Sequence, residues 1–224
     1  MTAMNLEQAR FNMVEQQIRP WNVVDQDVLD LLYTVRREEF VPPTWRALAF
    51  ADIEIPLRDN AEPGESMMAP KIEARILQAL AIRKAERVLE VGTGSGHMCA
   101  LLAAHAQHVH SVEISPELKT FGEANLARAG ITNASVELGD ASHGCARHAP
   151  YDIIVLTGST PVLPKEFLDQ LKTGGRLFAV VGDLPIMEGR LFTRVSDSDY
   201  KSIGLFETCL APLKNAPQPT RFEF

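Results

Sequence analysis

A glycine-rich turn is the part of this 224-residue sequence best suited to bind a ligand. The apolar run Val88–Val91, interrupted only by Glu90, leads into GTGSG, and a helical pattern follows. This order predicts a buried strand, a tight turn and a helix N-terminus. Glycine permits backbone conformations that a Cβ forbids and lets a ligand approach closely, while the helix start offers unpaired N–H groups. The predicted contacts with a nucleotide-like ligand come from Glu90, Gly92, Thr93, Gly94, Ser95 and Gly96.

The spacing of these glycines narrows the class of ligand. A dinucleotide-binding turn follows Gly-x-Gly-x-x-Gly, and its third glycine would fall at His97. Here the pattern is Gly-x-Gly-x-Gly, preceded by an acid. The turn therefore departs from the dinucleotide fingerprint.

Two further acids stand at the ends of the next two predicted strands. Glu113 ends the strand His108–Glu113, and Asp140 follows the strand Ala134–Leu138. An acid at the tip of the second strand is placed to accept hydrogen bonds from both hydroxyls of a ribose. Asp140 could accept one from an adenine amino group, and its neighbour Ala141 is assigned to the same site. The three strand tips would then lie along one adenosine.

These three tips, in this order, resemble the S-adenosylmethionine site of the Rossmann-like methyltransferases. An ordinary structural interpretation stays open beside this one. The glycine turn could simply connect a strand to a helix, Glu113 could be a solvated residue at a helix start, and Asp140 could be a turn former.

Composition and charge exclude several classes of protein. The chain has 22 Lys and Arg against 29 Asp and Glu, a net charge of −7, so it lacks the electrostatic footprint of a nucleic-acid-binding protein. No stretch reaches the roughly 18 apolar residues of a membrane span, and no signal peptide is recognised. The three cysteines form no C-x-x-C pair, which suits a reducing compartment. We therefore expect a cytoplasmic protein that binds neither nucleic acid nor membrane.

Residues 1–63 are predicted to form a helical N-terminal extension. Apolar residues recur at helical spacing over Asn5–Ile18, and Pro20 ends that helix. Asp25 is placed to cap a second helix. The stretch Trp45–Pro63 reads as a loop with a strand fragment around Ile53. Arg36 and Arg37 are expected either at a solvated helix end or in contact with an acidic substrate.

Residues 64–214 are predicted to form a Rossmann-like α/β core, and residues 215–224 a tail, all within one domain. Helices alternate with strands as far as the fifth strand, Arg176–Val181, and an antiparallel hairpin follows at one edge. The continuous apolar run in Tyr151–Leu156 is typical of a central strand that is covered on both faces. The predicted strands are Val88–Val91, His108–Glu113, Ala134–Leu138, Tyr151–Leu156, Arg176–Val181, Arg190–Val195 and Tyr200–Leu210.

Several signatures together resemble the protein-L-isoaspartate O-methyltransferase family, over nearly the whole chain. The resemblance implies a seven-stranded Rossmann-like sheet with S-adenosyl-L-methionine as cofactor. It further implies methyl transfer to a carboxylate of isoaspartyl residues in a protein or peptide substrate. The matching segments are MVEQQIRP at Met13–Pro20, VRREEFVP at Val35–Pro42, LEVGTGSG at Leu89–Gly96, SVE at Ser111–Glu113, GD at Gly139–Asp140, FLDQLKTGGRL at Phe167–Leu177 and APL at Ala211–Leu213.

The chain departs from this family in the loop before the first Rossmann helix. Met68 stands where the family has a serine near the acceptor carboxylate, and a thioether cannot donate a hydrogen bond. Glu65 replaces a glutamine and would repel an anionic acceptor. Ser66, two positions earlier, could supply the missing hydroxyl if the register of the loop shifted, so Ser66 and Met68 are the candidate catalytic residues. His97 and Ala141, which replace an aromatic residue and a glycine, should not exclude the cofactor.

Two rival functions remain open at this point. The first is a methyltransferase for a different, less polar acceptor. The second is a protein that keeps the fold and binds the cofactor without catalysing transfer. No metal is expected, because His108 and His110 share one strand face, and His143, Cys145 and His148 one loop, without further ligands at metal spacing.

Overall fold

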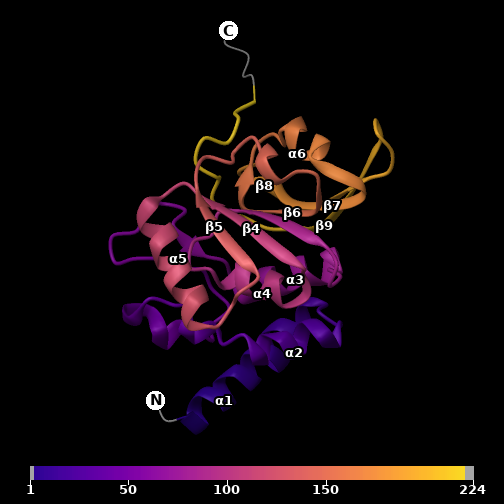
Figure 1. Cartoon of the computed structure of the whole chain (residues 1–224). Helices are drawn as coiled ribbons and strands as arrows, with labels where there is room; N and C mark the ends of the chain where they lie inside the picture. Colours follow the sequence, from indigo (N-terminus) through magenta and orange to yellow (C-terminus); the bar gives the residue numbers. More distant parts are fainter. Residues whose placement is uncertain (1–2, 220–224) are drawn as a thin grey trace.

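A seven-stranded sheet forms the centre of the computed structural model, which describes residues 3–219 (Figure 1). Its strand order is β5-β4-β3-β6-β7-β8-β9. The strands from β5 to β7 pair in parallel, and β8 and β9 add antiparallel at one edge. The bounds are β3 Arg87–Val91, β4 His108–Glu113, β5 Ala134–Leu138, β6 Tyr151–Thr160, β7 Leu171–Asp183, β8 Ile186–Arg194 and β9 Tyr200–Glu207. This is the predicted seven-stranded Rossmann-like sheet with its terminal hairpin.

Helices cover both faces of the sheet, which explains its apolar strands. One face packs against α3 (Pro70–Leu80), α4 (His97–His105) and α5 (Pro116–Arg128). The other face packs against α6 (Lys165–Asp169) and a loop that follows β5. Ile153 and Ile154, successive residues of β6, are both fully buried and belong to opposite cores. The strand is therefore central, as its sequence predicts.

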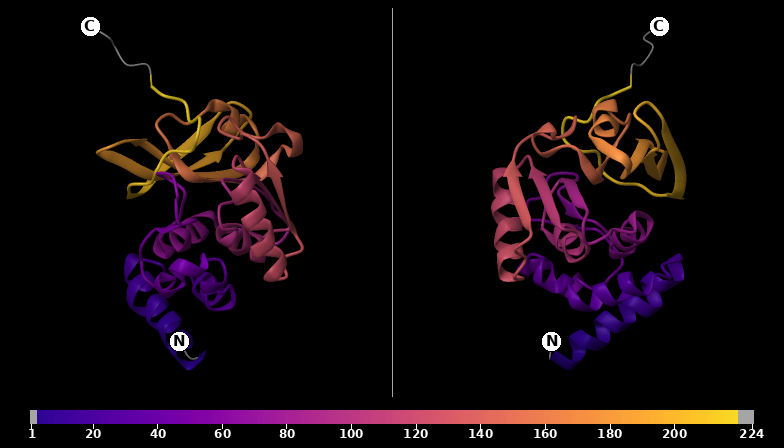
Figure 2. Two further views of the ribbon diagram at one scale, coloured as in Figure 1. Left: turned by 90° about the vertical axis from the view of Figure 1, so that its left-hand side faces the viewer. Right: turned by 45° about the vertical axis from the view of Figure 1, so that its right-hand side comes forward.

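The N-terminal extension is helical and lies below α3 and α4 at the end of the molecule opposite β8 and β9 (Figures 1 and 2). Helix α1 (Ala3–Asn12) continues as a π-helical stretch at Met13–Ile18 and a 3₁₀ turn at Arg19–Trp21. Helix α2 (Gln26–Thr34) begins at its predicted cap, where the Asp25 carboxylate accepts hydrogen bonds from two backbone N–H groups. Further 3₁₀ turns occupy Arg37–Glu39, Pro43–Leu48 and Ala146–His148. Buried side chains such as Ile18 and Leu29 join the extension to the main core.

Strands β7, β8 and β9 have other bounds than predicted, and two further elements differ from the sequence-based expectation. A small antiparallel sheet pairs β1 (Ile55–Pro56) with β2 (Ser66–Met67). The strand fragment therefore lies two residues after the predicted Ile53, which is in a bend, and its partner is too short to leave a sequence pattern. Strand β6 runs to Thr160, beyond the predicted end at Leu156, because its end pairs with β7 and with the segment at Pro212. Both differences depend on pairing between segments far apart in the sequence.

No helix within residues 3–219 combines the length and the apolar character needed to cross a lipid bilayer.

Candidate active site

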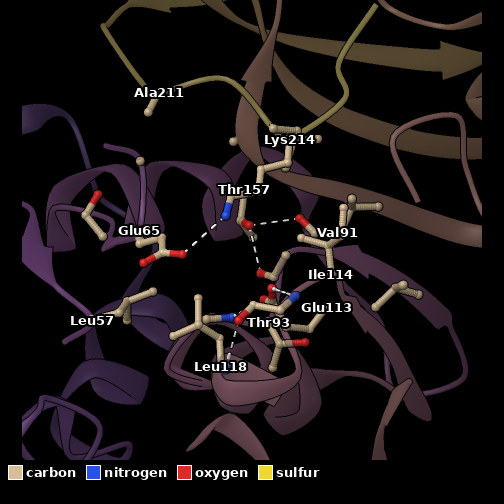
Figure 3. Close-up of a pocket in the computed structure, with 18 of the residues that line it drawn as sticks. Leu57, Glu65, Val91, Thr93, Glu113, Ile114, Leu118, Thr157, Ala211 and Lys214 are labelled. Carbon is tan, nitrogen blue, oxygen red and sulfur yellow. Dashed lines mark hydrogen bonds and ion pairs between the residues drawn. The ribbon is translucent and has the colours of Figure 1, made fainter. Parts of the chain in front are cut away.

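A pocket opens at the carboxyl ends of β3, β4 and β5, where open α/β sheets bind their ligands. The segment around β2 forms one wall and the C-terminal segment Leu210–Lys214 another (Figure 3). Of the residues assigned to this site from sequence, Gly92, Thr93, Gly94, Ser95, Glu113, Asp140, Ala141, Ser66 and Met68 line the pocket. The three predicted strand tips therefore do meet around one cavity.

The glycine turn has a conformation that only glycine adopts without strain. Gly92 has φ +95°, and a Cβ there would lie 2.3 Å from Thr157 Oγ1. The Thr157 hydroxyl donates to the carbonyls of Val91 and Gly92, each at 2.8 Å, and so fixes the turn to the end of β6. Gly96 lies behind the turn and caps α4 with a left-handed conformation instead of lining the pocket.

Glu113 lies where its predicted role requires. Its carboxylate is 4% exposed and accepts hydrogen bonds from the backbone N–H of Gly94 at 2.9 Å and of Ser115 at 3.0 Å. These bonds fix both oxygens at the pocket wall (Figure 3). Each carboxylate oxygen has a second lone pair, so Glu113 can still accept hydroxyl donors from a ligand.

Asp140 occupies the tip after β5. It accepts hydrogen bonds from the backbone N–H of Ser142 and from Asn215 Nδ2, both at 2.8 Å. Burial alone would raise the pKa of this carboxyl, but these donors outweigh it and the pKa is lowered, so Asp140 is ionised at neutral pH. The bond from Asn215 also ties the predicted tail to the pocket, and Asn215 was not predicted from the sequence.

Glu90 does not line the pocket. It is fully buried beneath the glycine turn, on the face of β3 that carries Val88, and it accepts a hydrogen bond from the Ser111 hydroxyl. Burial raises its pKa to about 8, against the lowering effect of the hydroxyl of Ser111 and the thiol of Cys99. The alternation of side chains along β3 could have predicted this position, because Glu90 must share the face of Val88 rather than that of Leu89 and Val91.

The raised pKa of Glu90 predicts a pH dependence of stability. Glu90 keeps its proton in the folded state up to about pH 8, whereas in the unfolded chain it ionises near pH 4.5. The contribution of Glu90 to the free energy of unfolding is therefore fully present below pH 4.5 and is lost as the pH rises toward 8. Glu90→Gln should remove this decline, which is on the order of 5 kcal/mol across the interval.

Urea denaturation of the wild type and Glu90→Gln between pH 5 and 9 measures this difference. Glu123→Gln is the matched control, because that side chain is 44% exposed and pairs only with Lys119 of the same helix. Parallel stability curves for the wild type and Glu90→Gln would show that Glu90 is not held neutral.

Met68 and Ser66 of the acceptor loop both line the pocket, but the Ser66 hydroxyl is hydrogen-bonded outside it. Met68 is 5% exposed and packs in the main core. The Ser66 hydroxyl donates to Glu54 Oε2 at 2.7 Å on the exposed side of the small sheet. Ser66 therefore does not replace the hydroxyl that Met68 lacks.

Glu65 is buried but electrically compensated. The Arg58 guanidinium donates two hydrogen bonds to its carboxylate, at 2.7 and 2.8 Å, and Lys214 Nζ lies 3.3 Å from it. Burial would raise the pKa of Glu65, but these donors and the backbone N–H of Glu62 lower it. The expected repulsion of an anionic acceptor by Glu65 is therefore largely offset by two cations that sequence reasoning did not connect with it.

A buried charge cluster supports the same loop from below. Arg37 is 2% exposed, pairs with Glu73 and donates to the Met68 carbonyl at 2.7 Å. His97 Nδ1 lies 3.0 Å from the Glu73 carboxylate, which itself lines the pocket. The expectation that Arg37 is solvated was wrong, because its guanidinium forms a buried ion pair with Glu73 of α3. Arg36, in contrast, is exposed.

A second group of polar residues lies outside the pocket. His110, Glu137 and His148 place one potential metal ligand each within 4.8 Å of the others. The two imidazole rings stack at 4.0 Å, and Arg87 and Arg147 contact His110 and Glu137. These guanidinium groups disfavour a bound cation, so we assign no metal site here.

Comparison with known proteins gives the same picture as the fold. Residues 8–207 match the model of the protein-L-isoaspartate(D-aspartate) O-methyltransferase family. The protein-L-isoaspartate O-methyltransferase of Methanoculleus marisnigri is 41% identical over 91% of this chain and 90% of its own length. A second relative, protein-L-isoaspartate O-methyltransferase 2 of Marinobacter nauticus, is 36% identical over 93% of this chain and 94% of its own length.

Solved structures agree with this likeness. A solved protein-L-isoaspartate O-methyltransferase has 25% identity and a TM-score of 0.77 over 91% of this chain, which spans 65% of the length of that protein. A Plasmodium falciparum structure, described as a protein-L-isoaspartate O-methyltransferase in complex with S-adenosyl-L-homocysteine, has 19% identity and a TM-score of 0.76, and it supports the fold alone. It covers 90% of this chain and 96% of its own. On the sequence match over most of its length, the chain belongs to the protein-L-isoaspartate(D-aspartate) O-methyltransferase family.

Proposed function

We propose that this chain transfers a methyl group from S-adenosyl-L-methionine to the carboxylate of an isoaspartyl residue in a protein or peptide. The observation that carries the proposal is the meeting of the glycine turn, Glu113 and Asp140 around one pocket in a member of this family. Its partners are damaged proteins or peptides, and neither nucleic acid nor membrane. The three cysteines are free thiols, which suits the cytoplasm as its location.

The described residues fit an adenosine group. The turn from Gly92 to Ser95 presents backbone without large side chains to the pocket. Glu113 would hold the ribose hydroxyls and Asp140 the adenine amino group, and both carboxylates have free lone pairs after their backbone hydrogen bonds. Ala141 and Ser142 line the wall beside Asp140.

The residues around the acceptor need to orient it rather than to move a proton. A carboxylate is already ionised at neutral pH, with an ordinary pKa of about 4, so no general base is required. Bound S-adenosylmethionine supplies an electrophilic methyl group on a sulfonium. Met67, Met68 and Leu57 form an apolar wall that excludes water from the acceptor carboxylate, and holding the reacting atoms in line accounts for the larger part of the rate.

A radiolabelled methyl-transfer assay with an isoaspartyl peptide tests the proposal, and the same peptide with normal aspartate is the control. We expect label in the isoaspartyl peptide only. Label that enters only small, less polar acceptors would favour the first rival function. Binding of the cofactor without transfer to any acceptor would favour the second.

Met68→Ser should accelerate this reaction. A hydroxyl at this position could donate to the acceptor carboxylate, and one hydrogen bond to a charged group contributes roughly 1.5–3 kcal/mol, or about ten- to a hundredfold in rate if it forms only in the transition state. Met13→Ser, at a buried core methionine that does not line the pocket, is the control for lost packing. No gain in kcat/KM for Met68→Ser over Met13→Ser would show that the loop does not contact the acceptor in this way.

A further inference from the structure

The charged side chains that line the pocket point to a role for one further residue, Lys214. Four carboxylates line the pocket, from Glu65, Glu73, Glu113 and Asp140, whereas Lys214 is the single positively charged side chain among the described residues that line it. Arg58 and Arg37 pair with Glu65 and Glu73, whereas no ion pair within residues 3–219 involves Glu113 or Asp140. A cation in the pocket would therefore favour the binding of an anionic acceptor. The side chain of Met68 cannot provide even a neutral donor.

We propose that Lys214 binds the acceptor carboxylate and thereby determines the specificity of this chain for an anionic acceptor. The inference rests on the proposed function, because it concerns the same reaction. It assigns to Lys214 the charge recognition that the loop around Met68 lacks.

The backbone around Lys214 is fixed against the pocket. The Ser159 hydroxyl donates to the Leu210 carbonyl at 2.7 Å, and the backbone N–H of Leu213 donates to the Ser159 carbonyl at 2.9 Å. At Gly158 a Cβ would lie 2.9 Å from Leu213 Cδ2, so the segment packs closely on the end of β6. The base of the Lys214 side chain is therefore placed by the fold, and the ammonium group alone is free to reorient.

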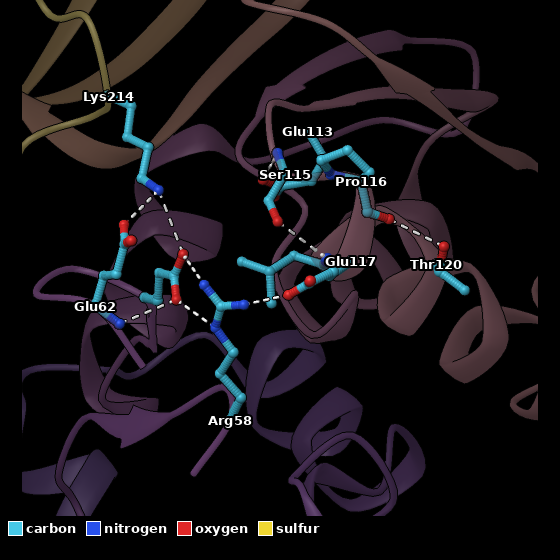
Figure 4. A network of polar contacts seen from close by, with 10 residues as sticks. Arg58, Glu62, Glu113, Ser115, Pro116, Glu117, Thr120 and Lys214 are labelled. Carbon is cyan, nitrogen blue, oxygen red and sulfur yellow. Dashed lines mark hydrogen bonds and ion pairs between the residues drawn. The ribbon is translucent and has the colours of Figure 1, made fainter. Parts of the chain in front are cut away.

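The ammonium group lies at the acceptor side of the pocket. Lys214 Nζ is 2.8 Å from Glu62 Oε2 and 3.3 Å from Glu65 Oε1, both on the segment that leads into the acceptor loop (Figure 4). The adenosine side is marked by Asp140, which the next residue, Asn215, contacts. Lys214 thus reaches away from the predicted adenine position.

The present partners of Lys214 can release it at little cost. The Glu62 side chain is 61% exposed, and ion pairs between solvent-exposed groups contribute little to stability. Glu65 keeps two bonds from Arg58 and one from the backbone N–H of Glu62 after Lys214 leaves. Arg58 cannot take the place of Lys214, because it is held between Glu65 and Glu117 and does not line the pocket (Figure 4).

Steady-state kinetics on isoaspartyl peptide with three variants test this role. Lys214→Met removes the charge and keeps most of the length, and we expect KM for the peptide to rise about tenfold or more while kcat changes less. Lys214→Arg should recover part of the loss. Lys172→Met is the matched control, since Lys172 is similarly exposed, at 41% against 46%, and pairs with Asp152 at the opposite end of the sheet.

Two further measurements separate charge recognition from a structural role. The second ligand is an isoaspartyl peptide whose acceptor carboxyl is converted to an amide. Its inhibition constant for the wild type should be higher than the dissociation constant of the carboxylate peptide. In Lys214→Met the two constants should be similar. The affinity for S-adenosyl-L-homocysteine, measured by calorimetry, should stay within about twofold.

An unchanged KM in Lys214→Met would overturn the inference, and so would a parallel loss of affinity for S-adenosyl-L-homocysteine, which would assign Lys214 to the carboxylate of the cofactor. A wild-type enzyme that does not methylate the peptide overturns the proposed function itself. A wild-type enzyme that does, with Lys214→Met equal to Lys172→Met, overturns only the role of Lys214.

Discussion

Arg37→Met is expected to lower the free energy of unfolding by about 3–5 kcal/mol, because it leaves the Glu73 carboxylate buried without the guanidinium group that pairs with it. Arg37 and Glu73 have side chains only 2% and 1% exposed, so water cannot replace the lost contact. Burial alone raises the pKa of Glu73, and the charges of His97 and Arg37 lower it below its ordinary value. The ionised carboxylate therefore depends on these two neighbours.

Urea denaturation compares Arg37→Met with Arg36→Met, a matched control whose side chain is 63% exposed and pairs only with the partly exposed Glu39. The control should lose no more than about 1 kcal/mol. The double variant Arg37→Met/Glu73→Met should recover most of the stability, because it removes both buried charges and keeps apolar volume. Equal losses for Arg37→Met and Arg36→Met would contradict this account of the cluster.

Glu113→Ala is expected to weaken the binding of S-adenosyl-L-homocysteine by roughly a hundredfold or more, since it removes the acceptor for two ribose hydroxyls. Calorimetry measures the affinity, and thermal denaturation shows whether the variant still folds. The second measurement is needed because Glu113 also accepts the backbone N–H groups of Gly94 and Ser115.

Two further variants isolate the role of Glu113. Glu113→Gln keeps the shape and one acceptor oxygen, and should lose less affinity than Glu113→Ala. Glu117→Ala is the control, because that side chain is 73% exposed and contacts Arg58 rather than the glycine turn. If Glu113→Ala binds as tightly as Glu117→Ala, the second strand tip does not hold the cofactor.

Local sequence patterns were sufficient to predict the elements that carry the cofactor site. The strands His108–Glu113 and Ala134–Leu138 have their predicted bounds, because the first ends on an acid and the second ends directly before Gly139. Helix α3 begins at Pro70, whose fixed φ suits a first helical turn. Since neighbouring parallel strands end at one edge, the order of these elements also predicted that Glu113 and Asp140 would share a pocket.

The acceptor side could not be predicted in the same way, because it depends on contacts between distant segments. Arg58 and Lys214 reach Glu65 from positions 7 and 149 residues away along the chain. Arg37 finds Glu73 across 36 residues, and no periodicity records that pairing. From the sequence motif alone, Glu65 is expected to repel an anionic acceptor. In the folded chain, Arg58 and Lys214 compensate its charge.

The most direct test of the central claim is a calorimetric titration of the wild-type chain with S-adenosyl-L-homocysteine. If the glycine turn, Glu113 and Asp140 form one adenosine site, the titration will show saturable heat at a single site per chain. The absence of saturable heat would contradict the cofactor site, and with it the methyl transfer proposed for this chain.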